Sequence, residues 1–399
     1  DLRGSAEFAQ AFPGSSQERF ARVGDADAVY RVLRFIPPIG GAQAAVELDP
    51  PLRVAVPAGT PIRRLGRGPA GNATTGIALS GGTAWLTTNK AIWQSGNDGR
   101  CAEFPDCWRD GGLGEWDGSG WEVFDPRNSD LADRDLADVA IDVAGAVWLA
   151  QSDGSKAGHG IIMFDPPTRR WVRHRATADL NAGNGPSDLA LDPATGDLWS
   201  AFIPIEDVVV LPGGQEQKIF AGGGVARWNG ERWRSWTKAD GGSTLRAYGD
   251  KGSLYAVLPD RANGRVWAGG WDGRQHKFHW PSGTGVDAIL NWCPLDACAP
   301  GDWRHVEWTG EGQVDALAVD AAGRMWAGLN RFELGLAPPR GGVRLFEDGA
   351  WSALTAESSG LPSGAITSLA PAGAGMWVGT WNDGAARFRI WAPGQNSVS

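Results

Sequence analysis

The chain has few tyrosines, methionines and cysteines: three, three and four in 399 residues. It also has no run of about 18 apolar residues, so we predict no transmembrane helix. Positive charge is in deficit, and the net charge is −9. This balance argues against nucleic acid, or an anionic membrane surface, as a partner held by bulk charge.

Familiar catalytic motifs are missing as well. The glycines at 222–224 precede a predicted strand rather than a helix, so they do not form a phosphate loop. No GxSxG occurs between a strand and a helix. The acidic stretch 125–138 lacks the spacing of a calcium-binding loop, and we interpret it as a solvated connection. The sequence favours a function without catalysis but does not decide whether the protein is an enzyme. No cofactor is predicted, and a divalent cation such as calcium or magnesium stays open.

Tryptophan is abundant, with 22 residues, and part of this excess is periodic. Six segments share an apolar strand, a glycine turn and a second strand that carries a Trp, at a mean spacing of about 58 residues. An Asp opens four of the turns. The repeating tryptophans are Trp85, Trp148, Trp199, Trp267, Trp326 and Trp377.

Two further strands follow most of these tryptophans, joined by Asp-Gly or Asn-Gly turns such as 348–349. Four antiparallel strands in a repeat of this length are typical of a β-propeller blade. A single sheet leaves both faces exposed, whereas stacked sheets bury them. We therefore expect the six tryptophans to form the core between blades.

The repeats resemble the two-component regulator propeller repeat. The best match is ITSLAPAGAGMWVGTWNDGAARF at 366–388, preceded by SGLPSG at 359–364, and the resemblance covers about 73–391. It implies a β-propeller. In that family the repeats commonly form the extracytoplasmic sensor region of membrane kinases.

The number of blades depends on the first 72 residues. We predict an all-β propeller of seven four-stranded blades, in which 26–72 form a degenerate blade and an N-terminal strand closes the ring. Six blades plus an N-terminal arm is the alternative. The expected domains are an extension at 1–25, one propeller at 26–391 with six Trp repeats at 73–391, and a tail at 392–399.

The cysteines form two close pairs, which are Cys101 with Cys107 and Cys293 with Cys298. Local pairs favour two disulfides in an oxidising compartment, so we expect an extracellular or periplasmic protein. Free thiols and a metal site are the alternatives.

Propeller ligands bind where the loops after the second strands meet. We take the polar and aromatic residues of these loops as the candidate binding site: Asp153, His159, Trp271, Asp272, Arg274, His276, Arg331, Glu333, Trp381, Asn382 and Asp383. Asn330 also begins one of these loops. Trp271 and Trp381 occupy matched places and could be stacking platforms for a sugar or a protein, or could pack on their own blades.

Three functions remain open. The leading hypothesis is a secreted or periplasmic binding or scaffold module with a protein or glycan partner, inside a larger extracellular assembly. The second is a metal-dependent lyase or glycan-cleaving enzyme. If His159, His276 and Glu333 converged, they would resemble the site of streptogramin lyases, seven-bladed propellers that use histidine, glutamate and a divalent metal. The third is a detached ligand sensor.

Overall fold

The fold is described from a computed structural model. It covers residues 19–23, 29–36, 45–49, 62–66, 73–89, 111–126, 128–132, 134–151, 160–174, 180, 185–210, 215–247, 252–272, 287–330, 341–372, 375–380, 385–390 and 396–398. The chain divides into two compact units, Asp1–Gln151 with Phe164–Trp171, and Ser152–Met163 with Val172–Ser399. None of the helices in the covered ranges reaches the length and apolarity that crossing a bilayer requires.

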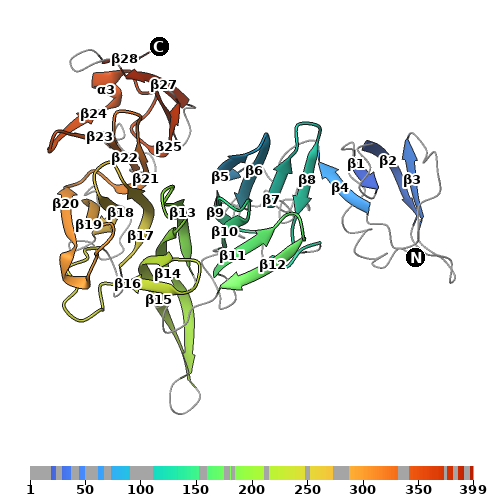
Figure 1. Cartoon of the computed structure of the whole chain (residues 1–399), viewed down its shortest axis with the longest axis horizontal. Coiled ribbons are helices and arrows are strands. Elements are labelled where there is room, and N and C mark those ends of the chain that lie inside the picture. Colours follow the sequence, from blue (N-terminus) through green and yellow to red (C-terminus); the bar gives the residue numbers. More distant parts are fainter. Residues whose placement is uncertain are drawn as a thin grey trace. The chain divides into compact units, whose positions relative to one another are not determined.

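Antiparallel sheets make up nearly all of the described chain (Figure 1). The first sheet contains β1 (Arg19–Val23), β2 (Val29–Ile36), β3 (Ala45–Asp49), β4 (Ile62–Gly66), β5 (Ala73–Ser80), β6 (Thr83–Asn89), β7 (Gly112–Trp116) and β8 (Trp121–Phe124). The second contains β9 (Leu136–Ile141), β10 (Val147–Gln151), β11 (Gly160–Asp165) and β12 (Arg170–His174). The third contains β13 (Pro186–Leu191), β14 (Leu198–Val210), β15 (Glu216–Trp228) and β16 (Trp233–Trp236).

The remaining sheets follow the same plan. The fourth contains β17 (Leu254–Asp260), β18 (Arg265–Asp272), β19 (Asp287–Pro294) and β20 (Arg304–Trp308), and the short helix η3 (Pro300–Asp302) precedes β20. The fifth contains β21 (Gln313–Val319), β22 (Met325–Asn330), β23 (Gly342–Glu347) and β24 (Ala350–Leu354). Helix α3 (Ala356–Ser359) leads to the sixth, with β25 (Ile366–Ala372), β26 (Gly375–Thr380), β27 (Ala385–Ile390) and β28 (Asn396–Val398).

Each sheet after the first pairs four strands in the order of the chain, which is the pattern of a propeller blade. The fold is therefore an all-β propeller, and the described residues contain six blades, as in the alternative above. The preferred seventh blade is not confirmed. Strands β1 to β4 instead extend the first sheet, because β4 pairs with the outer strand β8 through Leu65 and Glu122. An unpaired outer strand offers free backbone groups, and β4 satisfies some of them.

The last sheet corrects a second expectation. Its fourth strand is β28, from the expected C-terminal tail, and not a strand from the N-terminus. Closing the short connection after Ile390 costs less chain entropy than recruiting a strand from the far end of the sequence. The domain boundaries at residues 25 and 391 remain predictions.

Five of the six repeating tryptophans are buried, as expected. In the second unit, each buried ring is covered by the sheet that follows it. Trp267 packs with Leu317, Val319 and Met325 of the fifth sheet, and Trp326 packs with the sixth. Trp377 departs from the prediction, because 46% of its surface is exposed. It belongs to the last sheet, and no later sheet of the described chain follows it.

The turn aspartates have a second role besides bonding the turn backbone. The indole Nε1 of Trp267 donates to Asp260 Oδ2 at 2.9 Å, and Trp326 donates to Asp320 Oδ2 at 2.8 Å. The same aspartates accept from backbone amides of their turns, as Asp320 Oδ1 does from Ala322 at 2.9 Å. One carboxylate thus fixes both the turn and the core ring, which explains the spacing between Asp and Trp.

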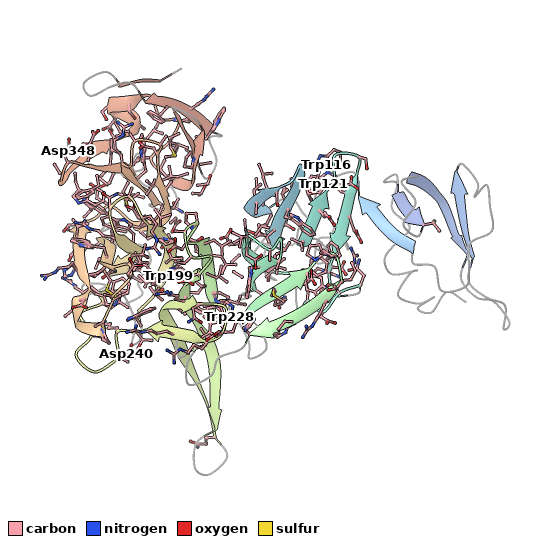
Figure 2. All side chains as sticks on the ribbon, viewed as in Figure 1. Trp116, Trp121, Trp199, Trp228, Asp240 and Asp348 are labelled. Atoms are coloured by element: carbon pink, nitrogen blue, oxygen red, sulfur yellow. A yellow bond between two sulfur atoms is a disulfide. The ribbon has the colours of Figure 1, made fainter. Side chains whose placement is uncertain are left out.

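Aromatic pairs close the outer hairpins. Trp116 and Trp121 are cross-strand partners with ring centroids 5.6 Å apart, and Trp228 and Trp233 repeat the arrangement at 5.5 Å. Figure 2 labels Trp116 and Trp121 next to each other. Directly opposed aromatic rings stabilise a hairpin, so this pair explains why the third strand often ends, and the fourth begins, with an aromatic residue.

Glycines in the third strands permit close contact between consecutive sheets. Gly224 and Gly342 have φ of 114° and 88°, and their amides donate to Gly252 O at 2.6 Å and Gly364 O at 2.8 Å. A Cβ on neighbouring Gly223 would lie 2.3 Å from Gly252 O. No other residue type fits there without displacing the backbone.

Candidate functional site

The inner strands share an irregularity at the end where they begin. In every sheet a register shift leaves one extra residue near the start of the inner strand, and this residue is Tyr255 in β17 and Asp315 in β21. A β-bulge of this kind leaves a residue outside the ladder and re-aims its side chain. At the same end, the second strands finish and the loops predicted to bind ligand begin. The extra residues are Thr75, Ala137, Ser187, Tyr255, Asp315 and Thr367.

Two of these residues have a structural role. Thr75 Oγ1 donates to Leu136 O at 2.6 Å, and Ser187 Oγ donates to Leu254 O at 2.7 Å. In both cases the acceptor is the first residue of the next inner strand, so a hydroxyl at the bulge joins consecutive sheets. These two side chains are satisfied by the fold itself.

Asp315 is arranged differently. Its Oδ1 accepts from Gln313 Nε2 at 2.6 Å, and its Oδ2 accepts from Asn330 Nδ2 at 2.5 Å. No ion pair joins Asp315 to an Arg, Lys or His among the residues that the structure describes. Burial raises the pKa of Asp315 to about 7, although the two hydrogen bonds act in the opposite direction. The residue as a whole keeps some accessible surface, while its carboxyl group is desolvated.

Asn330, the last residue of β22, is 5% exposed. Its Nδ2 is used by Asp315, but its Oδ1 has no hydrogen-bond partner within the described ranges. Leaving a buried amide oxygen unpaired costs roughly 1–3 kcal/mol. Asn330 Oδ1 lies where the loop after β22 begins, so it is a candidate ligand contact.

Tyr255 and Trp271 border this pair from the fourth sheet. Burial raises the pKa of the Tyr255 hydroxyl, hydrogen bonds with Ser253 and Trp271 lower it, and the charge of Asp315 raises it. Trp271 is half-buried near the end of β18, and its indole nitrogen is covered. We refer to Tyr255, Trp271, Gln313, Asp315 and Asn330 as the acceptor cluster, because its unused polar atoms are mainly acceptors.

Most of the predicted site lies outside the described residues. Trp271 belongs to the acceptor cluster, and Asp272 is the last residue of β18. The structure does not describe Asp153, His159, Arg274, His276, Arg331, Glu333, Trp381, Asn382 or Asp383, so their convergence remains a prediction. Among the described residues, no three His, Cys, Asp or Glu side chains gather as metal ligands would.

Sequence reasoning named Asn330 and Trp271 but missed Asp315 and Tyr255. Both lie in what reads as an ordinary alternating strand, where a polar residue indicates an exposed face. One feature of the sequence could have identified both residues. Polar residues recur at the second or third position of the inner strands in several repeats, as in Thr75, Ser187 and Thr367.

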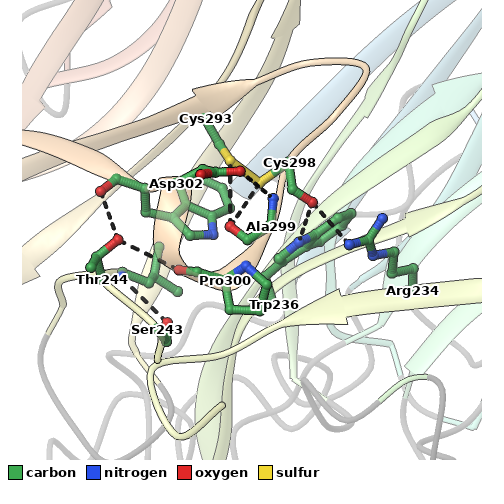
Figure 3. The surroundings of a disulfide bond; sticks show 11 residues. Arg234, Trp236, Ser243, Thr244, Cys293, Cys298, Ala299, Pro300 and Asp302 are labelled. Atoms are coloured by element: carbon green, nitrogen blue, oxygen red, sulfur yellow. Dashed lines mark hydrogen bonds between the residues drawn. A yellow bond between two sulfur atoms is a disulfide. The ribbon is translucent and has the colours of Figure 1, made fainter. Parts of the chain in front are cut away.

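One predicted disulfide is present. Cys293 and Cys298 are bonded, whereas Cys101 and Cys107 lie outside the described residues. Figure 3 shows what the bonded loop does: Cys298 O accepts from Arg234 Nη2 at 2.9 Å and from Trp236 Nε1 at 3.3 Å. Both donors belong to β16, so the loop fastens the fourth sheet to the third.

No protein-family model matches the sequence, and no curated protein does so significantly. Solved structures do match. PorZ, a surface component of the type IX secretion system of Porphyromonas gingivalis, has a TM-score of 0.50 at 18% identity, over 92% of this chain and 52% of PorZ. The extracellular domain of a putative hybrid two-component system from B. thetaiotaomicron has a TM-score of 0.49 at 14% identity, over 79% of this chain and 33% of that chain.

Virginiamycin B lyase from Staphylococcus aureus is more distant, with a TM-score of 0.38 at 10% identity, over 79% of this chain and 94% of the lyase. The chain spans about a third to a half of the length of the first two proteins. At 18% identity, the similarity to PorZ concerns the fold and does not transfer an activity.

Proposed function

We propose that the chain is an extracellular or periplasmic binding module that presents the loop end of its sheets to a protein partner. The observation that carries the proposal is the acceptor cluster, in which the buried Asn330 Oδ1 has no partner among the described residues. The inner strands of the other sheets have a bulge near the same end. The loop residues predicted from the sequence, Trp271 and Trp381 among them, would surround the cluster.

Other features agree with this proposal. The Cys293–Cys298 disulfide suits an oxidising compartment. Structural neighbours include a surface component of a secretion system and the extracellular domain of a two-component system. A scaffold role in a larger extracellular assembly fits a rigid, repeat-built fold that carries variable loops.

The test compares two asparagine variants of the purified chain. Immobilised protein is incubated with the extracellular and periplasmic fraction of the source organism, and retained proteins are quantified by mass spectrometry. Asn330→Ala should lose the partner that the unmodified chain retains. The matched control Asn229→Ala changes an exposed turn at the opposite end of the strands and should keep it. If both variants retain the same proteins equally, this end of the sheets is not the binding surface.

A further inference from the structure

Beyond a general binding surface, the acceptor cluster points to one kind of chemical group. We propose that Asp315, Asn330 and Tyr255 bind the positively charged side chain, lysine or arginine, of a protein partner. This inference rests on the proposed function and specifies its chemistry.

The first argument is the supply of donors and acceptors. An ionised carboxylate can accept about four hydrogen bonds, and Asp315 receives two from the side chains described. Asn330 Oδ1 receives none from them. A ligand that fits must therefore bring several donors together, as ammonium and guanidinium groups do.

The second argument is charge. Strand β21, which carries Asp315, contacts β17, β18, β19, β22 and β25. Among the described groups, the charge of Asp315 raises the pKa of Tyr255 on β17. Burial holds the pKa of Asp315 near 7 because the described residues supply no cation. An incoming cation would supply the missing counter-charge, and the net charge of −9 would attract it from a distance.

The third argument is the aromatic border. Tyr255 lies next to Asp315, and Trp271 lies next to Tyr255. Aromatic faces attract ammonium and guanidinium groups, most strongly where water is excluded. A sugar could use the same rings, but its hydroxyls also need donors from the protein, and the cluster offers few. The cation is therefore the better fit.

The test uses N-acetyl-arginine amide and N-acetyl-lysine amide as cationic probes, with neutral N-acetyl-citrulline amide and methyl glucoside as controls. Calorimetric titration of the full chain at pH 8 should give a Kd of about 10 mM or tighter for a cationic probe, and at least tenfold weaker binding of citrulline. Binding should weaken as the pH falls below 7, because Asp315 becomes protonated. Asp315→Asn should bind at least tenfold more weakly and lose this pH dependence.

Three outcomes separate this inference from the proposed function. Absence of cation binding, or preferential binding of methyl glucoside, overturns the cationic ligand even if Asn330→Ala still loses the partner. Cation binding that is unchanged in both Asp315→Asn and Asn330→Ala also overturns it, because the cation is then bound elsewhere. Cation binding that depends on Asp315, in a chain that retains no partner, supports the site and overturns the proposed function. Thermal unfolding confirms that each variant is folded.

Discussion

The fifth and sixth repeats carry the same tryptophan in different surroundings. Trp326 is 3% exposed, bonds to Asp320 and is covered by the sixth sheet, whereas Trp377 is 46% exposed. Ala372 occupies the place that corresponds to Asp320, so Trp377 has no carboxylate there. Arg387 lies over its ring, with 5.8 Å between the guanidinium carbon and the centroid. Of these two rings, the one that a following sheet covers is core, and the one in the last described sheet is half exposed.

The largest expected effect is a difference in the free energy of unfolding between variants of these two tryptophans. Trp326→Ala should lower the free energy of unfolding by about 3–5 kcal/mol, because it removes a fully packed ring and leaves a cavity. Trp377→Ala should lower it by roughly 1 kcal/mol or less, because the ring is half exposed. Denaturant unfolding of both variants measures the difference. Equal losses would mean that Trp377 is covered in the folded protein, and that the contrast between the repeats is absent in solution.

A smaller effect concerns the bulge position, where the fifth repeat has Asp315 and the sixth has Thr367. The pKa of Asp315 is raised to about 7 by burial, so the folded state holds its proton more tightly than the unfolded state. The contribution to stability is complete below about pH 4, the ordinary pKa, and is lost as the pH rises through 7. Unfolding free energies measured from pH 4 to pH 8 should therefore fall.

Asp315→Asn, which keeps the shape of the side chain, should flatten this part of the profile. Thr367→Val, at the matched position of the sixth repeat, is the control and should leave the slope unchanged. A slope that survives Asp315→Asn would assign the titration to another group.

The smallest expected effect is a gain in stability when the sixth repeat receives the carboxylate that the fifth repeat has. Ala372→Asp places a carboxylate at the register position that corresponds to Asp320 in the fifth repeat, where we expect it to accept from the Trp377 indole. Because Trp377 is half exposed, the gain should be about 0.5–1 kcal/mol. Denaturant unfolding of Ala372→Asp measures it, and the gain should disappear when Trp377→Phe removes the indole donor. An equal gain in both backgrounds would assign it to the turn alone.

Part of the candidate site followed from the sequence. The Trp spacing located the ends of the second strands, and with them Asn330 and Trp271. Asp315 and Tyr255 were missed because a bulge changes the direction of a side chain without changing the residue pattern. The structure has the six blades of the alternative prediction, and the preferred seventh blade was not confirmed for a related reason. Strands β1 to β4 could have formed a blade by sequence, but β4 pairs with the outer strand β8.

The sequence by itself determined the repeat, the turns and the identity of the core rings, because these depend on neighbours within about twenty residues. Glycine, aspartate and tryptophan act there through local backbone geometry and hydrogen bonds. Only the tertiary structure decided which ring is covered, which strand completes the last sheet and which carboxyl group lacks a counter-charge. These features depend on contacts with residues far away in the chain. The sequence of a single repeat does not show whether a neighbouring sheet buries it.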